Sequence, residues 1–324
     1  MSGHHPIRVL EKTFMHTDLP AQITKETAEQ YAISKRTLHL SASTLKSEID
    51  VYLFAGGFLY IPSPLKSVAK KQIVSSVLTQ VLYPPYRNSL DRALDLTDID
   101  LYAEFQKKTP SLAVQMLNDP VANVKLKQDP YAPPEIKEAA ANGIFIIDPI
   151  SLIKKIRWSS LGIYYDWERK MYDRTINNPF PEILLQACQD ISTFICQVPD
   201  FVPETAVVNY YQKKDRIMSH IDRYEEDMTK PLISFSFGAS CIFVLGKKEK
   251  ESSEVSSFLL QDGDIAILIG DSREYLHGVP KILTENTGLS EYADEPYFPL
   301  INESRINISI RQAFKHPSPP PSKI

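Results

Sequence analysis

The sequence lacks several features that would assign it to a specialised class of protein. Its three cysteines (Cys188, Cys196 and Cys241) are too few for a closed disulfide framework and are not spaced as a zinc knuckle. No run approaches the roughly 18 uninterrupted apolar residues of a membrane helix, and the opening residues lack the apolar core of a secretory signal. We therefore expect a protein of a reducing compartment, located in the nucleus and cytoplasm, with no membrane partner.

Strong charge of either sign is also missing. The net charge of −4 argues against nonspecific coating of nucleic acid, although it leaves room for a local basic groove. Small basic clusters occur at residues 70–71, 154–157, 213–214 and 247–250, and each is interpreted either as a solvated surface or as a contact for a polyanion. The 43% hydrophobic and 23% charged content is typical of a soluble globular protein.

Histidine is scarce, and its distribution is informative. Of the seven histidines, only His220 and His277 lie between residues 40 and 314. His220 precedes Asp222 by two positions, so on a strand both side chains would point to the same face. Two imidazoles and one carboxylate that leave other positions open suit a non-haem Fe(II) oxygenase. Core histidines or a zinc hydrolase with the same three ligands are the alternatives.

A second pattern lies in RINISIR at residues 305–311, where polar residues alternate strictly with isoleucine. On a strand, one face would be aliphatic and the other would carry Arg305, Asn307, Ser309 and Arg311. A guanidinium binds a carboxylate through two parallel hydrogen bonds, so such a face can hold a dicarboxylic acid that binds iron at its other end. The alternative is an exposed edge strand that is charged to prevent aggregation.

Short apolar runs separated by turn residues dominate the chain after residue 155. Residues 207–314 are predicted to be strands and turns, with residues 231–238 and 241–245 paired around a Gly-Ala-Ser turn. Residues 51–61 are expected to form a strand and residues 67–82 an amphipathic helix. Many short antiparallel strands around a metal indicate a jelly roll. We predict an α+β fold with a double-stranded β-helix (jelly roll) core and a helical N-terminal extension.

Six ordered motifs run through this half of the chain: NYY at 209–211, HIDRYE at 220–225, KPLISFSFG at 230–238, GD at 263–264, HGVP at 277–280 and RINISIR at 305–311. Together they resemble the AlkB family of Fe(II)/2-oxoglutarate dioxygenases. IRW at 156–158, LG at 161–162, YDW at 165–167 and NPFP at 178–181 are similar to its eukaryotic AlkB homologue 1 branch. The resemblance covers about residues 50–314 and is loose before residue 155.

The resemblance implies a dioxygenase that uses Fe(II), 2-oxoglutarate and O2, with ascorbate in support. It implies that His220, Asp222 and His277 are the catalytic iron ligands. It also implies five cosubstrate-binding residues: Asn209, Tyr211, Arg305 at the distal carboxylate, Asn307 and Arg311. In this family 2-oxoglutarate loses carbon dioxide to give succinate, and a hydroxylated methyl group leaves as formaldehyde. The cofactor supplies this chemistry, and the protein supplies placement and a dry pocket.

The chain departs from the family pattern at two places. Bacterial members carry an acidic base-recognition residue where this chain has Tyr224, and an arginine where it has Ser256 and Ser257. Repair of alkylated bases is therefore less expected, whereas catalysis itself is not affected, because the homologue 1 branch departs similarly.

The predicted activity is oxidative demethylation of N-methyl groups on transfer RNA or DNA, with the base flipped into the pocket. The alternative is a demethylase or hydroxylase of protein, histone tails in particular, which the net negative charge favours. A non-catalytic binding module would have no use for the metal ligands together with both arginines. Candidate residues for a lid over the substrate are Phe58, Tyr60, Tyr86 and Arg87, and the aromatic ones are otherwise expected in the core.

We divide the chain into four parts. Residues 1–45 form the N-terminal extension, and residues 46–150 form a helical region that serves as substrate-recognition lid, loop-rich from residue 88 onward. Residues 151–314 form the Fe(II)/2-oxoglutarate dioxygenase jelly roll. Residues 315–324, rich in proline and serine, form a disordered tail.

Overall fold

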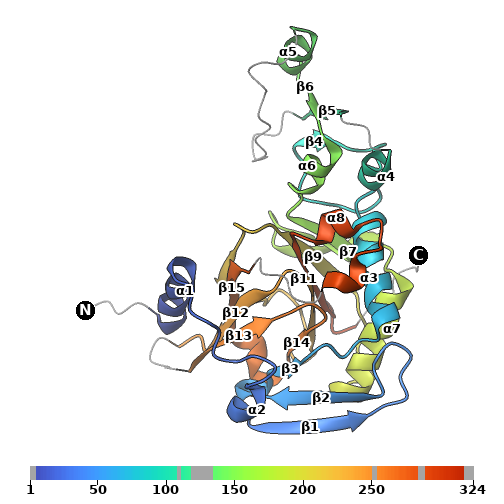
Figure 1. Cartoon of the computed structure of the whole chain (residues 1–324). Helices are drawn as coiled ribbons and strands as arrows, with labels where there is room; N and C mark the ends of the chain where they lie inside the picture. The colour runs from blue at the N-terminus through green and yellow to red at the C-terminus, as the bar shows by residue number, and fades with distance from the viewer. Residues whose placement is uncertain (1–4, 108–110, 118–133, 250–253, 284–288, 317–324) are drawn as a thin grey trace.

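The computed structural model describes residues 5–107, 111–117, 134–249, 254–283 and 289–316, whose strands form three antiparallel sheets (Figure 1). The large sheet has nine strands, in the order β1 (Ser34–His39), β2 (Glu48–Leu53), β3 (Leu59–Ile61), β14 (Ile265–Leu268), β11 (Leu232–Gly238), β16 (Arg305–Arg311), β9 (Thr205–Tyr211), β7 (Trp158–Asp166) and β8 (Met171–Asn178). The small sheet has four, in the order β10 (Ile217–His220), β15 (Leu276–Ile282), β12 (Cys241–Gly246) and β13 (Val255–Leu260). The third sheet has the order β4 (Leu94–Asp95), β5 (Leu112–Met116) and β6 (Ile144–Ile147).

Helices cover the outer faces of the two larger sheets. The helices are α1 (Pro6–His16), α2 (Ala28–Tyr31), α3 (Ser67–Thr79), α4 (Leu101–Gln106), α5 (Pro134–Ala141), α6 (Pro149–Ile153), α7 (Glu182–Asp190), which continues as a π turn to Ile195, and α8 (Phe298–Ile301). In Figure 1, α3 and α7 lie beside each other against the large sheet, whereas α1 lies on the small sheet. Helices and antiparallel sheets together confirm the α+β class. No helix among the described residues is long and apolar enough to span a membrane.

The two faces predicted for RINISIR are confirmed. Ile306, Ile308 and Ile310 are fully buried in a core that they share with apolar residues of α3 and α7. The polar residues face a cavity between the sheets. Because β16 pairs with β11 on one side and with β9 on the other, the interpretation as an exposed edge strand is wrong. Burial of such an aliphatic stripe is a main source of stability, about 2 kcal/mol for each side chain.

The expected pairing of residues 231–238 with residues 241–245 is wrong. β11 belongs to the large sheet and β12 to the small one, so the two-residue connection between them crosses from one sheet to the other. Gly238 permits the change of direction, because its φ of +75° lies in the left-handed region. Both strands are buried along their whole length, and each has two partners within its own sheet. A continuous apolar run therefore reveals a central strand but not its sheet.

Two other predictions need correction. The run at residues 51–61 is not one strand: Gly56 and Gly57, with φ of +71° and +91°, turn the chain between β2 and β3. Residues 88–149 were expected to be loops with short helices, but they also contain the third sheet. The helix predicted at 67–82 is confirmed as α3. The division into four parts stays a prediction, and most of the tail lies outside the described residues.

Gly162 in β7 is expected to tolerate no side chain. Its φ is +64°, and a Cβ there would lie 2.2 Å from the carbonyl oxygen of Glu204 and 2.5 Å from the ring of Phe180. We expect Gly162→Ala to lower the free energy of unfolding by about 3 kcal/mol, through backbone strain and overpacking together. Gly270→Ala is the matched control: its φ is +63°, but the nearest atom would be 3.3 Å away. It should cost only about 1 kcal/mol in urea titrations; equal losses would contradict this explanation.

Candidate active site

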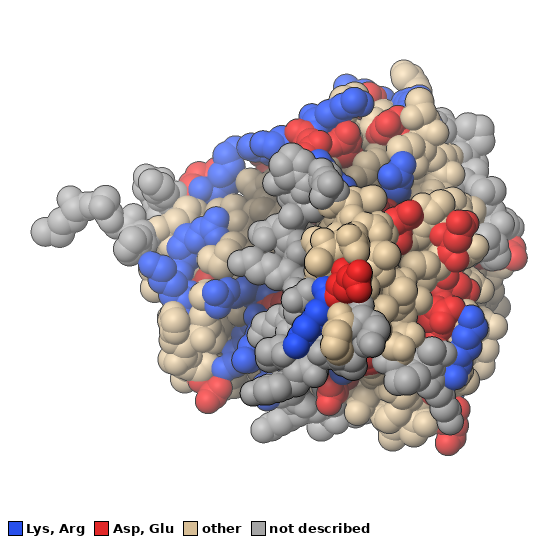
Figure 2. Space-filling model, turned by 90° about the horizontal axis from the view of Figure 1, so that it is seen from above, with Lys and Arg blue, Asp and Glu red and all other residues tan. Residues whose placement is uncertain are grey.

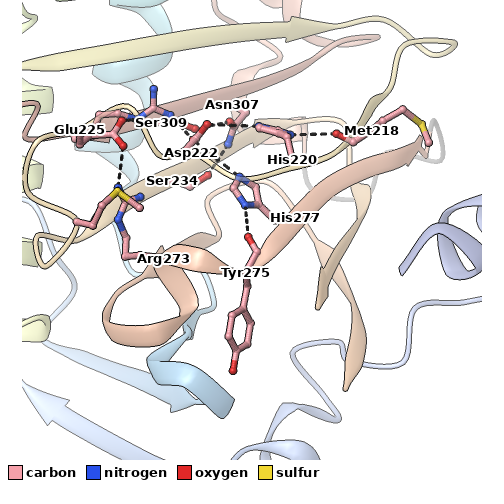
Figure 3. A network of polar contacts seen from close by, with 12 residues as sticks. Met218, His220, Asp222, Glu225, Ser234, Arg273, Tyr275, His277, Asn307 and Ser309 are labelled. Carbon is pink, nitrogen blue, oxygen red and sulfur yellow. Dashed lines mark hydrogen bonds and ion pairs between the residues drawn. The ribbon is translucent and has the colours of Figure 1, made fainter. Parts of the chain in front are cut away.

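Two paired strands bring the metal-ligand candidates together. His220 ends β10 and pairs directly with His277 in β15, and their ring centroids are 4.7 Å apart. Asp222 lies two residues beyond β10, so the expectation that it shares a strand face with His220 is wrong. The loop nevertheless places its carboxylate beside both rings (Figure 3), and one possible ligand atom from each of the three residues lies within 4.8 Å of the others.

Backbone carbonyl groups fix both imidazoles. Nδ1 of His220 donates to the carbonyl oxygen of Met218 at 3.1 Å, and Nδ1 of His277 donates to that of Tyr275 at 3.3 Å. A carbonyl oxygen only accepts, so each Nδ1 carries the hydrogen and each Nε2 keeps its lone pair. These Nε2 atoms lie 3.6 and 3.9 Å from Asp222 oxygens. Burial, assisted by the neighbouring His220, lowers the pKa of His277 to about 4, so its ring is neutral at pH 7.

Asp222 is held ionised by its surroundings. Nη2 of Arg311 donates to its Oδ2 at 2.6 Å. Burial alone would raise the pKa of Asp222, but the positive charge of Arg311 outweighs burial and holds this pKa well below its usual range. Two nitrogen lone pairs and an anionic carboxylate therefore converge at one point. Their mutual repulsion is relieved when a cation lies between them, so the three residues fit a divalent metal.

A buried network of charged side chains contacts Arg311 and, through it, Asp222. Glu225 accepts from the hydroxyl of Tyr172 at 2.6 Å and from Nη2 of Arg273 at 3.0 Å, and it lies 3.4 Å from Nε of Arg311. The side chains of Glu225 and Arg273 are each only 2% exposed. Two guanidinium groups thus balance the carboxylates of Glu225 and Asp222. Sequence reasoning missed Arg273 and Tyr172, because nothing in a single sequence links them to the metal-ligand motif.

The predicted cosubstrate residues line one cavity beside the metal group. The polar face of β16 forms one wall, and Asn209 and Tyr211 of β9 lie directly opposite Asn307 and Arg305 in the strand register. The amide nitrogen of Asn307 already donates to Ser234 Oγ at 2.7 Å and to the Phe235 carbonyl oxygen at 2.9 Å. The sheet therefore uses both hydrogens of this amide, which leaves Asn307 with a role in shaping the wall.

Arg305 differs from Arg311, because it is buried with two spare donors and, among the described residues, no carboxylate accepts a hydrogen bond from it. It is 1% exposed, and its Nη2 donates to Ser236 Oγ at 3.0 Å. Nε and Nη1 have no hydrogen-bond partner among the described residues. Burying a guanidinium with unpaired donors is unfavourable, so a site of this kind calls for an anion. A carboxylate that accepts two parallel hydrogen bonds fits these donors, as 2-oxoglutarate would with its distal end.

A second, outer cavity opens on the other side of the metal group. It shares His220, Asp222, Arg311 and Trp167 with the inner cavity, and its remaining walls are rich in tyrosine: Tyr165, Tyr172 and Tyr224. Trp167 is 49% exposed and Tyr224 is 42% exposed, whereas Tyr165 packs edge-on against Trp167 with ring centroids 4.8 Å apart. Exposed aromatic faces at a cavity mouth suit the stacking of a flat ligand.

Three of the predicted lid residues are core residues instead. Phe58 and Tyr60 are fully buried in the apolar cluster between the sheets, where Phe58 contacts Phe243 and Phe258. Tyr86 is also buried, at 6% exposed, in the core beneath the large sheet. Lid function is therefore wrong for all three aromatic candidates, and the physical reason is that β3 carries Tyr60 inside the sheet stack.

Comparisons with known proteins agree with this geometry. Residues 114–311 match the family described as 2OG-Fe(II) oxygenase superfamily. The chain is 32% identical to the DNA N(6)-methyladenine demethylase ALKBH1A of Arabidopsis thaliana, over 80% of this chain and 75% of that protein. It is 37% identical to the nucleic acid dioxygenase ALKBH1 of Homo sapiens over 46% of this chain and 38% of that protein. It is 36% identical to the tRNA demethylase abh1 of Schizosaccharomyces pombe, over 49% and 53% respectively.

Proposed function

The chain belongs to the 2OG-Fe(II) oxygenase superfamily, in its AlkB homologue 1 branch, and on this basis we propose that it removes N-methyl groups oxidatively from nucleic acid, either transfer RNA or DNA. The proposal rests above all on one observation. The metal-ligand candidates lie at the junction of a polar inner cavity, which contains the unpaired donors of Arg305, and an aromatic outer cavity. Cosubstrate and substrate can thus approach one metal from opposite sides.

Within this proposal, His220, Asp222 and His277 hold Fe(II), and Asn209, Tyr211 and Arg305 hold 2-oxoglutarate. Iron and 2-oxoglutarate together supply the oxidation of a methyl group by dioxygen. We also infer that the two facing larger sheets form the double-stranded β-helix of the family. The apolar cluster between them, which includes Phe243 and Leu268, keeps water from the inner cavity.

The outer cavity would receive the methylated base. Trp167 and Tyr224 offer faces for stacking, and stacking on an aromatic side chain is worth about 1–3 kcal/mol for each base. Arg223 lies on the wall itself, so positive charge is available at this cavity for a phosphate. Relatives named for DNA and for tRNA support the substrate class, and none of the three relatives above is named for a histone.

Coupled turnover tests the proposal. Purified protein with Fe(II), 2-oxoglutarate and ascorbate should form succinate faster when a methylated oligonucleotide or transfer RNA is added. Formaldehyde should appear in equal amount, because each oxidised methyl group leaves as one formaldehyde. Unmethylated copies of the same polymers are the controls. Stimulation by a methylated histone peptide alone would replace the nucleic acid proposal with the protein alternative.

A further inference from the structure

The strand that carries His220 is weakly held within its own sheet. β10 lies at the edge of the small sheet, and within the described part of the chain its one partner strand is β15. Its register shifts between Ile217 and His220, as in a β-bulge. Opposite this irregularity lies Gly278, where a Cβ would come within 2.8 Å of the Ser219 nitrogen. A bulged edge strand has fewer ladder hydrogen bonds than a regular one, so a metal ligand at its end needs support from elsewhere.

Helix α1 supplies this support from the far end of the sequence. Its apolar residues Ile7 and Phe14 are buried against Ile242 and Val244 of β12, on the outer face of the small sheet. This packing turns Arg8 and Glu11 toward β10. Glu11 is completely buried, although it is charged and lies on a short helix. A buried carboxylate is tolerated when charged or polar partners satisfy it.

Those partners are the polar groups of Ser219. Oε1 of Glu11 accepts from both the backbone nitrogen and the hydroxyl of Ser219, each at 2.5 Å. Nη2 of Arg8 donates to the carbonyl oxygen of Ser219 at 2.9 Å, and its Nη1 donates to Oε2 of Glu11 at 2.9 Å. The two side chains thus bind every polar group of one residue. Hydrogen bonds to charged groups are stronger than neutral ones, so Ser219 is held firmly.

Ser219 is the residue between the two that determine the position of the His220 ring. His220 follows it, and Met218, whose carbonyl oxygen accepts from Nδ1 of that ring, precedes it. A rotation of the Ser219 backbone would move the ring and its orienting carbonyl apart. We propose that Glu11 and Arg8 are positioning residues of the metal site, and that they hold His220 in its metal-binding geometry by clamping Ser219. The inference rests on the proposed function, because that function places iron at His220.

Metal affinity measures this effect directly. Loss of groups that orient a metal ligand lowers affinity by about 10–100-fold. We expect Glu11→Ala to raise the dissociation constant for Co(II), followed by its visible absorption, within that range. Arg8→Ala should give a smaller increase in the same direction, because it removes the contact to the Ser219 carbonyl and the ion pair with Glu11 but leaves both hydrogen bonds from Ser219 to Glu11. It also serves as the second variant if Glu11→Ala does not fold.

Two control variants lie on the same helix. Lys12 is exposed, so Lys12→Ala should leave the affinity unchanged. Ile7→Ala weakens the packing of α1 but keeps the clamp, so it lowers the melting temperature with little change in affinity. If Ile7→Ala and Glu11→Ala lowered affinity equally at equal losses of melting temperature, α1 would act through stability alone and the inference would be overturned. Wild-type affinity in folded Glu11→Ala would overturn it as well.

Hydrogen exchange of the metal-free protein separates this inference from the proposed function. Loss of the charged acceptor should speed exchange in the peptide that contains residues 217–222 by about tenfold or more in Glu11→Ala. Lys12→Ala should exchange like the wild type. If the wild type bound no Co(II), the proposed function would fail, whereas the exchange result would still decide whether α1 clamps β10. Unchanged exchange in Glu11→Ala would refute the clamp whatever the metal result.

Discussion

Replacing Asp222 with alanine is expected to abolish succinate formation and, in addition, to destabilise the protein without its metal. The loss of turnover follows from the loss of a proposed iron ligand. The loss of stability has another cause. Asp222 accepts from Arg311 at 2.6 Å, and without it Arg311 and Arg273 share the single carboxylate of Glu225. Breaking a largely buried ion pair by removing one partner costs about 3 kcal/mol, because an uncompensated charge remains.

His220→Ala is the matched comparison for this prediction. It removes another proposed ligand, so turnover should fall to the same background. The side chain of His220 is 39% exposed and is held by a hydrogen bond to the Met218 carbonyl oxygen rather than by an arginine, so the free energy of unfolding should change by no more than about 1 kcal/mol. Urea titrations in the presence of a chelator measure this difference for both variants. Residual turnover in either variant, or equal stability of the two, would contradict this account of the site.

The sequence predicts those parts of this protein whose signals are local. Strict alternation over seven residues identified both faces of β16, because side chains on a strand point to opposite sides in turn. The scarcity of histidine indicated the metal group, since only two histidines lie between residues 40 and 314. The spacing of His220 and Asp222 predicted the right residues, but it placed both on one strand, whereas Asp222 lies in a loop after β10. The identity of the metal-binding residues was predictable, whereas the backbone conformation that positions Asp222 was not.

Long-range contacts account for most of what sequence reasoning missed. Glu11 and Ser219 are 208 residues apart, and no pattern in one sequence relates them. The chain passes from one sheet to the other between β11 and β12, because each of these strands pairs with strands of a different sheet. A buried apolar run does not show which strands will pair with it. Tyr60 was predicted to lie either in a lid or in the core, and the sequence alone did not decide between the two. Its place in the fold is decided by the pairing of β3 with β14.

The second large effect concerns Arg305, whose replacement should weaken the use of 2-oxoglutarate without lowering the stability of the ligand-free protein. We expect Arg305→Met to raise the 2-oxoglutarate concentration for half-maximal turnover by about 100-fold, since two charge-assisted hydrogen bonds to a carboxylate are lost. The free energy of unfolding of the ligand-free protein should not fall, because the guanidinium is buried with two unpaired nitrogens. Asp264, whose pKa burial raises to about 6, takes up a proton more readily once this charge is gone.

Arg311→Met is the matched comparison for Arg305→Met, and it tests whether the different partners of the two arginines determine their different roles. Both arginines lie on the polar face of β16, but Arg311 is paired with Asp222, whereas Arg305 is not paired with any carboxylate by a hydrogen bond. Loss of Arg311 should therefore destabilise the ligand-free protein, and loss of Arg305 should not. Under anaerobic conditions with Fe(II), 2-oxoglutarate should raise the melting temperature of the wild type and much less that of Arg305→Met, because a ligand stabilises in proportion to its occupancy. Equal stabilisation of both proteins by 2-oxoglutarate would show that its distal carboxylate binds elsewhere, and the free donors of Arg305 would then need another anion.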